Sequence, residues 1–311
     1  MGLSSLPTQV GDATLAVETR GIEKRYDFTV PALAGLDLQV PEGAVYVLVG
    51  PNGAGKSTAL KILLDVVRAD CGEARVCGLR TTERPALVRA QIGYVPEVVE
   101  TAYGWLTARE FLAHHASFYG AWDHGYADAL CRRLAVPLHG RMDGLSKGAL
   151  RRVVLVAALA HRPPVLLLDE PTDGLDPLAR EDFCALLVEH VTTSPTTVLW
   201  STHHVHEADR MADHVGVIQS GRLVLQAPRD VVDSSLRRYR AQVPAGWTGA
   251  PGLNGEVLLR EGAGREIAWT VWGPEREVAA RLEASGAAVR DAAALSLEDA
   301  TLVLLRAGRE A

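Results

Sequence analysis

The sequence predicts an α/β fold built around a phosphate-binding loop, and three observations support this prediction. An apolar run of strand length at 44–49 leads directly into a glycine-rich segment at 50–58, which a helical apolar pattern follows. Two further apolar runs, at 165–168 and 196–200, each end in polar side chains. Buried strands that alternate with helices and end in polar loops are typical of α/β proteins.

The glycine-rich segment 50–58 completes the pattern G-x-x-x-x-G-K-[ST]. Its glycines let the backbone turn tightly, so that several N–H groups and a helix N-terminus face one anion. Lys56 is expected to reach the β and γ phosphates, and the Ser57 hydroxyl is expected to ligate Mg²⁺, which prefers hard oxygen donors. A glycine turn without a ligand is the alternative. The predicted nucleotide contacts are Asn52, Gly53, Ala54, Gly55, Lys56, Ser57 and Thr58.

A pair of acidic residues, Asp169 and Glu170, ends the strand at 165–168. We expect Asp169 to hold Mg²⁺, directly or through water. Glu170 is then placed to act as general base, or to orient the water that attacks the γ phosphate. Two acids that merely end a strand in solvent are the alternative, and the presence of the glycine loop in the same chain argues against it.

The segment 145–149 reads L-S-K-G-A, and apolar residues follow it at helical spacing. Ser146 stands at the N-cap position, and a helix start that holds a serine and Gly148 forms a second anion site. Because the glycine loop already contacts one side of a nucleotide, this second site is expected to bind the nucleotide of another subunit. An ordinary capped helix is the alternative.

The order of these motifs strongly resembles that of the ATP-binding subunits of ABC transporters, over roughly residues 15–230. In this family L-S-G-G-Q stands where the chain has 145–149. The segment 171–177 looks like the family's D-loop, which implies a contact of Asp176 with the partner's nucleotide. His203 matches the family's switch histidine, which implies a contact with the γ phosphate and a part in catalysis together with Lys56.

Two further positions are assigned only through this resemblance. Tyr26 stands where the family keeps a ring that stacks on adenine, although a half-buried strand aromatic is an equal alternative. Glu97 follows 92–96 in the hinge loop, where the family usually carries a glutamine that ligates Mg²⁺. His203 together with His204 and His206 could suggest a metal site, but side chains at this spacing in a helix do not share one face.

The resemblance implies a P-loop NTPase core with an antiparallel β part and a helical subdomain at 98–160, within an ATP-binding domain at 15–230. It implies ATP and Mg²⁺ as cofactors, ATP hydrolysis, and two copies paired head to tail. It also implies an exporter-type system, in which a separate transmembrane permease subunit holds the chain on the cytoplasmic, inner face of the membrane. The alternative is a soluble ABC ATPase that acts on ribosomes or DNA, but the coiled coils, zinc modules or basic arms of such proteins are not evident.

An apolar cluster follows the hinge loop. In the family this region receives a coupling helix of the membrane subunit, and exposed apolar residues with polar surroundings often mark an interface. Aromatic residues that fill the local core are an equal alternative. The cluster contains Val98, Val99, Tyr103, Gly104, Trp105 and Leu106.

The segment 231–311 is predicted to form a small α+β accessory domain, and its role stays open among regulation, dimer contact and stability. The pattern predicts strands at 238–243, 256–260 and 267–272 and a helix at 275–284. A last helix is expected to open at Ser296.

The composition is ordinary for a globular protein, with 311 residues, a hydrophobic fraction of 48% and a charged fraction of 23%. The formal net charge is −6 and no dense basic tract occurs, so a nucleic-acid partner is not expected. Apolar runs such as 153–160 fall short of the ~18 residues that span a bilayer, and 1–16 lacks the pattern of an export signal. The cysteines at 71, 77, 131 and 184 are expected to be reduced and mostly buried.

Overall fold

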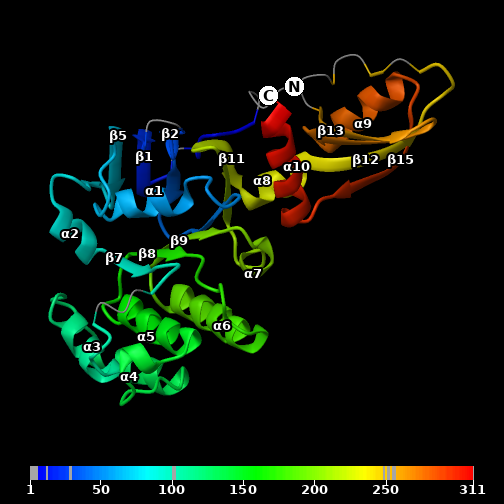
Figure 1. Cartoon of the computed structure of the whole chain (residues 1–311). Helices are drawn as coiled ribbons and strands as arrows, with labels where there is room; N and C mark the ends of the chain where they lie inside the picture. Colours follow the sequence, from blue (N-terminus) through cyan, green and yellow to red (C-terminus); the bar gives the residue numbers. More distant parts are fainter. Residues whose placement is uncertain are drawn as a thin grey trace.

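The computed structural model describes residues 6–11, 13–27, 30–99, 103–247, 249–250, 253 and 257–310. These residues form three sheets with helices around them (Figure 1). Among the described residues, no helix combines the length and the apolar character that crossing a bilayer requires.

The central sheet has six strands in the order β11-β10-β4-β9-β8-β7. Only β11 pairs antiparallel, with β10, and the other pairings are parallel. Every residue of β4, β8 and β9 is buried, which explains why these strands read as continuous apolar runs. The predicted α/β fold is confirmed. The strands are β4 (Val45–Val49), β7 (Ile92–Val95), β8 (Val165–Asp169), β9 (Thr197–Thr202), β10 (His214–Gln219) and β11 (Arg222–Pro228).

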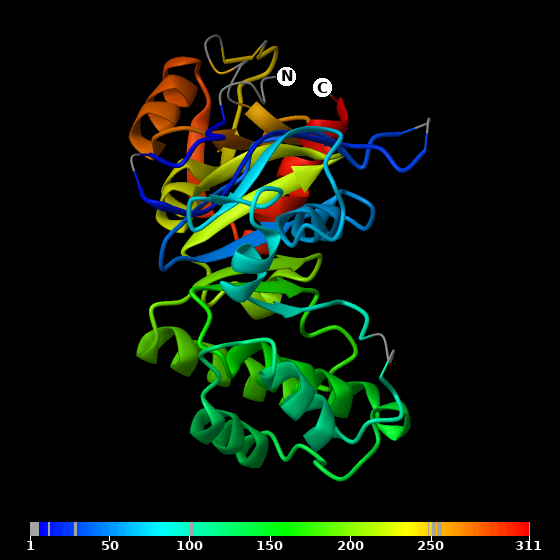
Figure 2. The same cartoon turned by 90° about the vertical axis from the view of Figure 1, so that its left-hand side faces the viewer.

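A second, antiparallel sheet and a group of helices lie on opposite sides of the central sheet (Figures 1 and 2). Tyr46 and Leu60 belong to the core between the two sheets, which also contains Leu33. The antiparallel sheet is formed by β1 (Leu15–Lys24), β2 (Leu33–Leu36), β3 (Gln39–Pro41), β5 (Cys71–Val76) and β6 (Leu79–Arg80), with α1 (Lys56–Leu63) and α2 (Pro85–Ala90) nearby.

Four helices of the other side, α3 to α6, begin with a side chain that caps the N-terminus. Thr107 and Glu110 form a capping box, in which Glu110 Oε2 accepts from Thr107 N at 2.8 Å. Ser146 is the N-cap of α5, and its Oγ accepts a hydrogen bond from Ala149 N at 3.3 Å. The segment contains α3 (Ala108–Ala116), α4 (His124–Arg133), a 3₁₀ turn (Met142–Gly144) and α5 (Lys147–Leu159), and α6 (Pro177–Thr193) and α7 (Val205–Ala208) follow further along the chain.

The third sheet has the order β13-β14-β12-β15 and follows α8 (Arg229–Ser235). The predicted strands and helix are present as β12 (Leu236–Gln242), β13 (Val257–Ala263), β14 (Glu266–Trp272) and α9 (Glu275–Ala284). The sequence did not predict β15 (Ala288–Ala294), because its alanines favour strands weakly and its pairing with β12 decides its conformation.

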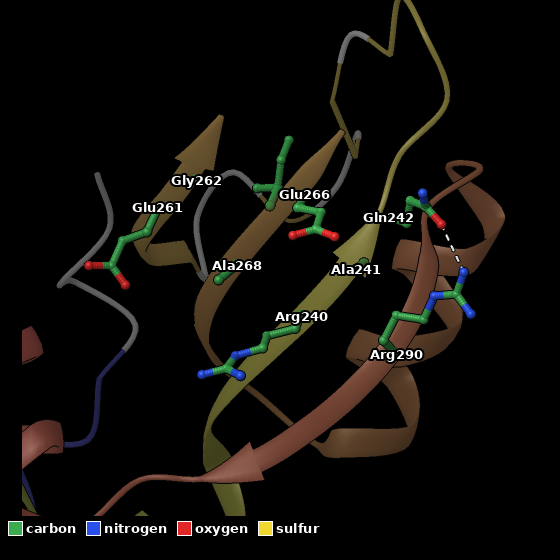
Figure 3. Close-up of a pocket in the computed structure, with 9 residues that line it drawn as sticks. Arg240, Ala241, Gln242, Glu261, Gly262, Glu266, Ala268 and Arg290 are labelled. Atoms are coloured by element: carbon green, nitrogen blue, oxygen red, sulfur yellow. Dashed lines mark hydrogen bonds between the residues drawn. The ribbon is translucent and has the colours of Figure 1, made fainter. Parts of the chain in front are cut away.

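One face of this sheet packs on α9, where Tyr239, Val271 and Leu282 are fully buried. The opposite face carries a hollow of about 630 Å³ (Figure 3). There Arg290 Nη2 donates to Gln242 Oε1 at 2.8 Å.

The last helix, α10 (Leu297–Glu310), returns to the central sheet. Its Val303 and Leu304 are buried in the same core as Val215 and Leu225 of β10 and β11. Gln219 Nε2 donates to the Leu305 carbonyl at 3.1 Å and anchors the helix to the end of β10. The C-terminal segment therefore contributes side chains to the core of the central sheet.

All four cysteines are free thiols, but the prediction that most are buried was wrong. Cys131 is buried on the inner face of α4, whereas Cys71 is exposed at the first residue of β5. Cys77 and Cys184 are half-buried.

Candidate active site

The phosphate loop connects β4 to α1, and its backbone packs so closely against neighbouring residues that two positions require glycine. Gly55 has φ +107°, and a Cβ there would lie 2.5 Å from the Ala32 carbonyl oxygen. At Gly50 a Cβ would lie 2.4 Å from the Ile218 carbonyl oxygen. The loop conformation therefore depends on residues without a side chain, as the sequence motif predicts.

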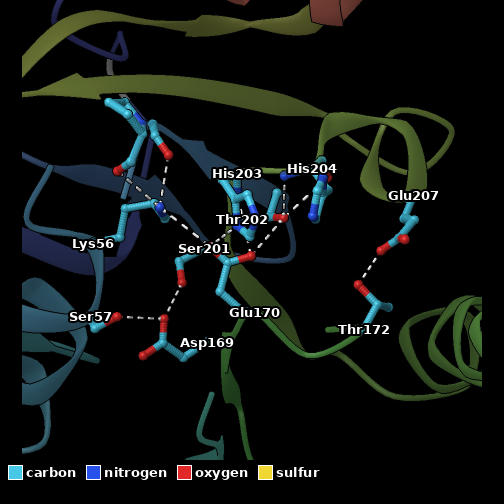
Figure 4. A network of polar contacts seen from close by, with 12 residues as sticks. Lys56, Ser57, Asp169, Glu170, Thr172, Ser201, Thr202, His203, His204 and Glu207 are labelled. Atoms are coloured by element: carbon cyan, nitrogen blue, oxygen red, sulfur yellow. Dashed lines mark hydrogen bonds and ion pairs between the residues drawn. The ribbon is translucent and has the colours of Figure 1, made fainter. Parts of the chain in front are cut away.

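The Lys56 side chain curls back over the loop and is 5% exposed. Its Nζ donates to the Gly50 carbonyl at 2.8 Å and to the Pro51 carbonyl at 3.3 Å. It also lies 3.3 Å from Glu170 Oε1, which joins the loop to the end of β8 (Figure 4). A positive charge is thus held inside the loop by neighbouring backbone oxygens and one carboxylate.

Ser57 and Asp169 lie side by side, although 112 positions separate them in the sequence. Ser57 Oγ donates to Asp169 Oδ1 at 3.1 Å, and Ser201 Oγ donates to the same oxygen at 2.5 Å. The parallel pairing of β8 with β9 places Asp169 opposite Ser201. A hydroxyl and a carboxylate therefore present hard oxygen atoms at one point of the loop.

Glu170 adopts a left-handed conformation, with φ +43°, directly after β8. Such a backbone costs energy for a residue other than glycine and is often found at functional sites. The Oε2 atom accepts hydrogen bonds from Thr202 Oγ1 at 3.0 Å and from His203 N at 3.2 Å. His203 Nδ1 lies 2.9 Å from Oε1, in a contact that lacks the direction of a hydrogen bond. The end of β9 thus fixes the Glu170 carboxylate beside Lys56 (Figure 4).

A cavity of about 440 Å³ brings most of the predicted site residues together. Glu97 and Glu170 line it opposite the phosphate loop, and Tyr26 lies beside its edge, because its hydroxyl is 3.5 Å from Thr58 Oγ1. The Tyr26 ring is 62% exposed, which makes its face accessible to a planar ligand. The loop residues that line the cavity are Asn52, Gly53, Ala54, Gly55, Lys56, Ser57 and Thr58.

The donor set at this cavity fits Mg²⁺. Ser57 Oγ and the Asp169 carboxylate are adjacent, and Glu97 faces the same space. Mg²⁺ is usually held by one or two protein oxygens together with phosphate oxygens and water. Burial, with a smaller effect of the Asp169 and Glu97 charges, raises the pKa of Tyr94 beside this set, so its phenol stays neutral.

The predicted residues Ser146, Gly148 and Asp176 lie apart from this cavity. They line a separate cavity of about 530 Å³ at the start of α5 and α6. Asp176 caps α6 through a bond from Ala179 N to its Oδ1 at 3.0 Å. A Cβ on Gly148 would lie 3.7 Å from Leu175 Cδ2, which is an ordinary van der Waals contact.

The three histidines after β9 do not form a metal site. The His203 and His204 rings lie with their centroids 3.9 Å apart and their planes tilted by 42°, whereas His206 Nε2 pairs with Glu298 Oε2 at 2.8 Å. Within the described ranges, no group of three His, Cys, Asp or Glu side chains could hold a metal ion.

Comparison with known proteins agrees with this geometry. A family model described as ABC transporter matches residues 33–173. The daunorubicin/doxorubicin resistance ATP-binding protein DrrA of Streptomyces peucetius is 37% identical over 236 residues, which cover 72% of this chain and 68% of that protein. The chain belongs to the ABC transporter family of ATP-binding proteins.

Three more comparisons extend the similarity of this ABC ATPase to known proteins. The Nod factor export ATP-binding protein I of Burkholderia thailandensis is 36% identical over 235 residues, covering 71% of this chain and 73% of that protein. A solved ATP-binding subunit of an ABC transporter is 29% identical with a TM-score of 0.63, covering 70% of this chain and 92% of that one. A dimeric ABC cassette with bound ADP and Pi is 25% identical with a TM-score of 0.61, covering 68% and 98%. The chain is therefore an ATP-binding and ATP-hydrolysing enzyme with the P-loop NTPase fold.

Sequence reasoning missed three side chains of this ABC ATPase that hold the site together. Ser201 and Thr202 fix Asp169 and Glu170, and their polar character at the end of an apolar strand was the available signal. The third is Arg151, whose guanidinium reaches the carbonyl of Glu170. An arginine within the apolar pattern of α5 was the only hint of its burial.

Proposed function

We propose that this chain powers an ABC exporter, as one of two ATP-hydrolysing subunits that pair head to tail and bind a separate transmembrane permease. The observation that carries the proposal is that Ser146, Gly148 and Asp176 line a different cavity from the one lined by the phosphate loop, Glu97 and Glu170. In this arrangement the chain would be peripheral to the cytoplasmic face of the membrane. DrrA and the Nod factor protein support an export role through their names, which describe drug resistance and export.

In the proposed reaction Lys56 and the loop N–H groups bind the β and γ phosphates. Ser57, Asp169 and Glu97 would hold Mg²⁺, which neutralises phosphate charge when it is bound. Glu170 accepts the proton of the attacking water at its carboxylate, and Thr202 keeps that carboxylate in place. His203, 2.9 Å from Glu170, is placed to contact the γ phosphate.

The second cavity would complete the site of the other copy. Ser146 and Gly148 offer a helix N-terminus without acidic side chains in its first turn, which favours an anion. Lys147 adds a positive charge beside them. Since these groups belong to a cavity other than that of Lys56, a second copy is needed to bring them to the same nucleotide.

The permease would bind next to the hinge loop. Val98, Tyr103 and Trp105 are 69%, 45% and 65% exposed, whereas Val99 and Leu106 pack against the core. Exposed aromatic and aliphatic side chains in one short segment are typical of a protein interface. The proposed docking patch therefore consists of Val98, Tyr103 and Trp105.

Affinity purification of the tagged chain from membranes in mild detergent tests the proposal. Mass spectrometry is expected to find one polytopic membrane protein in a stoichiometric amount. The Val98→Arg variant should lose this partner, because a charge in the docking patch cannot be buried without cost. Val66→Arg is the matched control, since Val66 is 68% exposed outside the patch, and it should keep the partner.

Recovery of ribosomal or DNA-associated proteins in place of a membrane protein would contradict the export role and favour a soluble ABC ATPase. Equal loss of the partner in Val98→Arg and Val66→Arg would contradict the location of the docking patch. ATP hydrolysis by both purified variants at the wild-type rate would confirm that neither change damages the active site.

A further inference from the structure

The guanidinium of Arg151 is a buried cation that the reaction described above does not use. It lies on α5 five residues after the N-cap Ser146 and is 7% exposed. An arginine at this depth requires hydrogen-bond partners, because a buried and unpaired charge is strongly unfavourable. Its partners therefore indicate what it does.

Arg151 binds four backbone carbonyl oxygens from two segments far apart in the sequence. Nη2 donates to Glu97 O at 2.8 Å and to Asp173 O at 3.4 Å. Nη1 donates to Pro96 O at 3.0 Å and to Glu170 O at 3.1 Å. One planar group thus joins the hinge loop to the turn that carries the proposed general base.

The surroundings of the Arg151 guanidinium have two further features. Glu170 has a left-handed backbone, with φ +43°, and Arg151 binds its carbonyl together with Asp173 N. The charges of Asp173, Glu97, Asp169 and Glu170 oppose the effect of burial, which lowers the pKa of Arg151. Arginine stays protonated in proteins, so the group donates all four bonds at once.

The position of Arg151 also connects it to the start of its helix. A helix rises 1.5 Å per residue, so Arg151 lies only about 7 to 8 Å along α5 from Ser146. Since α5 is continuous from Lys147 to Leu159, a displacement of its N-terminus moves Arg151 as well. Displacement of Arg151 in turn shifts the carbonyls of Glu97 and Glu170.

We propose that Arg151 is a positioning residue that couples the engagement of the α5 N-terminus by the partner copy to the placement of Glu97 and Glu170 in the same chain. This inference rests on the proposed function, because the partner's nucleotide supplies the displacement. A change at Arg151 should therefore reduce turnover and cooperativity, while the phosphate loop keeps its affinity for ATP.

The test compares Arg151→Met, Arg151→Lys and Arg132→Met in the full-length chain. Arg132 is the matched control, because it lies on α4 next to α5 and its side chain makes no hydrogen bond or ion pair within the described residues. Four quantities are measured: kcat, the Hill coefficient for ATP, the Kd of a fluorescent ATP analogue and the melting temperature.

For Arg151→Met we expect kcat to fall by about 10- to 100-fold, since small misplacements of catalytic groups have effects of this size. The Kd of the ATP analogue should stay within about threefold of wild type, because the contacts that bind ATP equally in the ground state and the transition state are kept. The Hill coefficient should approach that of independent sites. Arg151→Lys should restore part of kcat, because one ammonium group can donate to some of the four carbonyls. Arg132→Met should match the wild type in all four quantities.

The inference is overturned if Arg151→Met keeps the kcat of Arg132→Met. It is also overturned if kcat and ATP affinity fall in the same proportion, since that pattern indicates general damage to the fold. Should Arg151→Met fail to fold, the same comparison of kcat with Kd in Arg151→Lys decides. A wild-type protein that turns over ATP without cooperativity and copurifies with no membrane protein would refute the proposed function. The effect of Arg151 on kcat would still be measured in that protein.

Discussion

The junction between α4, α6 and β9 predicts a loss of stability in mild acid. His190 of α6 is 1% exposed, and its Nδ1 lies 2.8 Å from the Tyr126 hydroxyl. Thr196 Oγ1 donates to the Pro163 carbonyl at 3.1 Å, so it can accept from His190 Nε2 at 3.3 Å. Nδ1 is then left to accept from Tyr126, and the network requires a neutral ring.

Burial, and then the charge of Arg162, lowers the pKa of His190 from 6.5 to about 4. The difference of about 2.5 pH units corresponds to about 3 kcal/mol in the free energy of unfolding. Because the pKa is lower in the folded state, this stability is fully present above pH 6.5. It is lost progressively as the pH falls from 6.5 to about 4, where the unfolded chain binds the proton first.

Urea unfolding of the wild type and His190→Gln, at several pH values between about 8 and 4, measures this effect. Glutamine can accept from Tyr126 and donate to Thr196 without titrating. The stability advantage of the wild type over the variant should shrink by about 3 kcal/mol across this interval. Burial also lowers the pKa values of His115, His161 and His214, but their contribution is common to both proteins. Parallel stability curves, or an NMR titration of His190 near 6.5, would refute the reasoning.

Two predictions concern the active site. Glu170→Gln should bind ATP like the wild type but release phosphate about 10²- to 10⁴-fold more slowly, because an amide accepts a proton poorly; turnover at the normal rate would exclude Glu170 as the base. Gly55→Ala should lose nucleotide affinity and melt at a lower temperature, because its Cβ would meet the Ala32 carbonyl oxygen at 2.5 Å. Gly53→Ala is its control, since Gly53 has φ +80° with nothing within 4 Å, and it should cost only about 1–2 kcal/mol of backbone strain. Equal effects of the two alanines in calorimetry and ATP binding would contradict the importance of the contact with Ala32.

The predictable part of the fold consists of elements whose character is local. The strands β4, β8 and β9 are buried on both faces, so their apolar runs identified them. In contrast, β15 is a run of alanines and charged residues that becomes a strand only because β12 pairs with it. The packing of α10 on β10 and β11 could not be predicted from the sequence either, because an apolar helix face does not indicate which core it will cover.

The site shows the same division between local and distant interactions. The phosphate loop is one continuous segment, so its sequence pattern is sufficient to recognise it. Arg151 acquires its contacts only when the carbonyls of residues 96–97, 170 and 173 meet around it. Backbone carbonyls carry no sequence signature, and a side chain that binds only them cannot be assigned a role from sequence alone.

The return of α10 to the central sheet determines which parts of the C-terminal region can be deleted without damage to the central core. The chain leaves the central sheet after β11 and returns to it through α10, and Leu236 of β12 and Leu258 of β13 are buried in the same core. Shortening the protein at residue 230 would remove Val303 and Leu304 from the core that contains Val215 and Leu225. Excising the sheet and α9 while joining α8 to α10 would keep Val303 and Leu304 but remove Leu236 and Leu258, so neither deletion leaves this core intact.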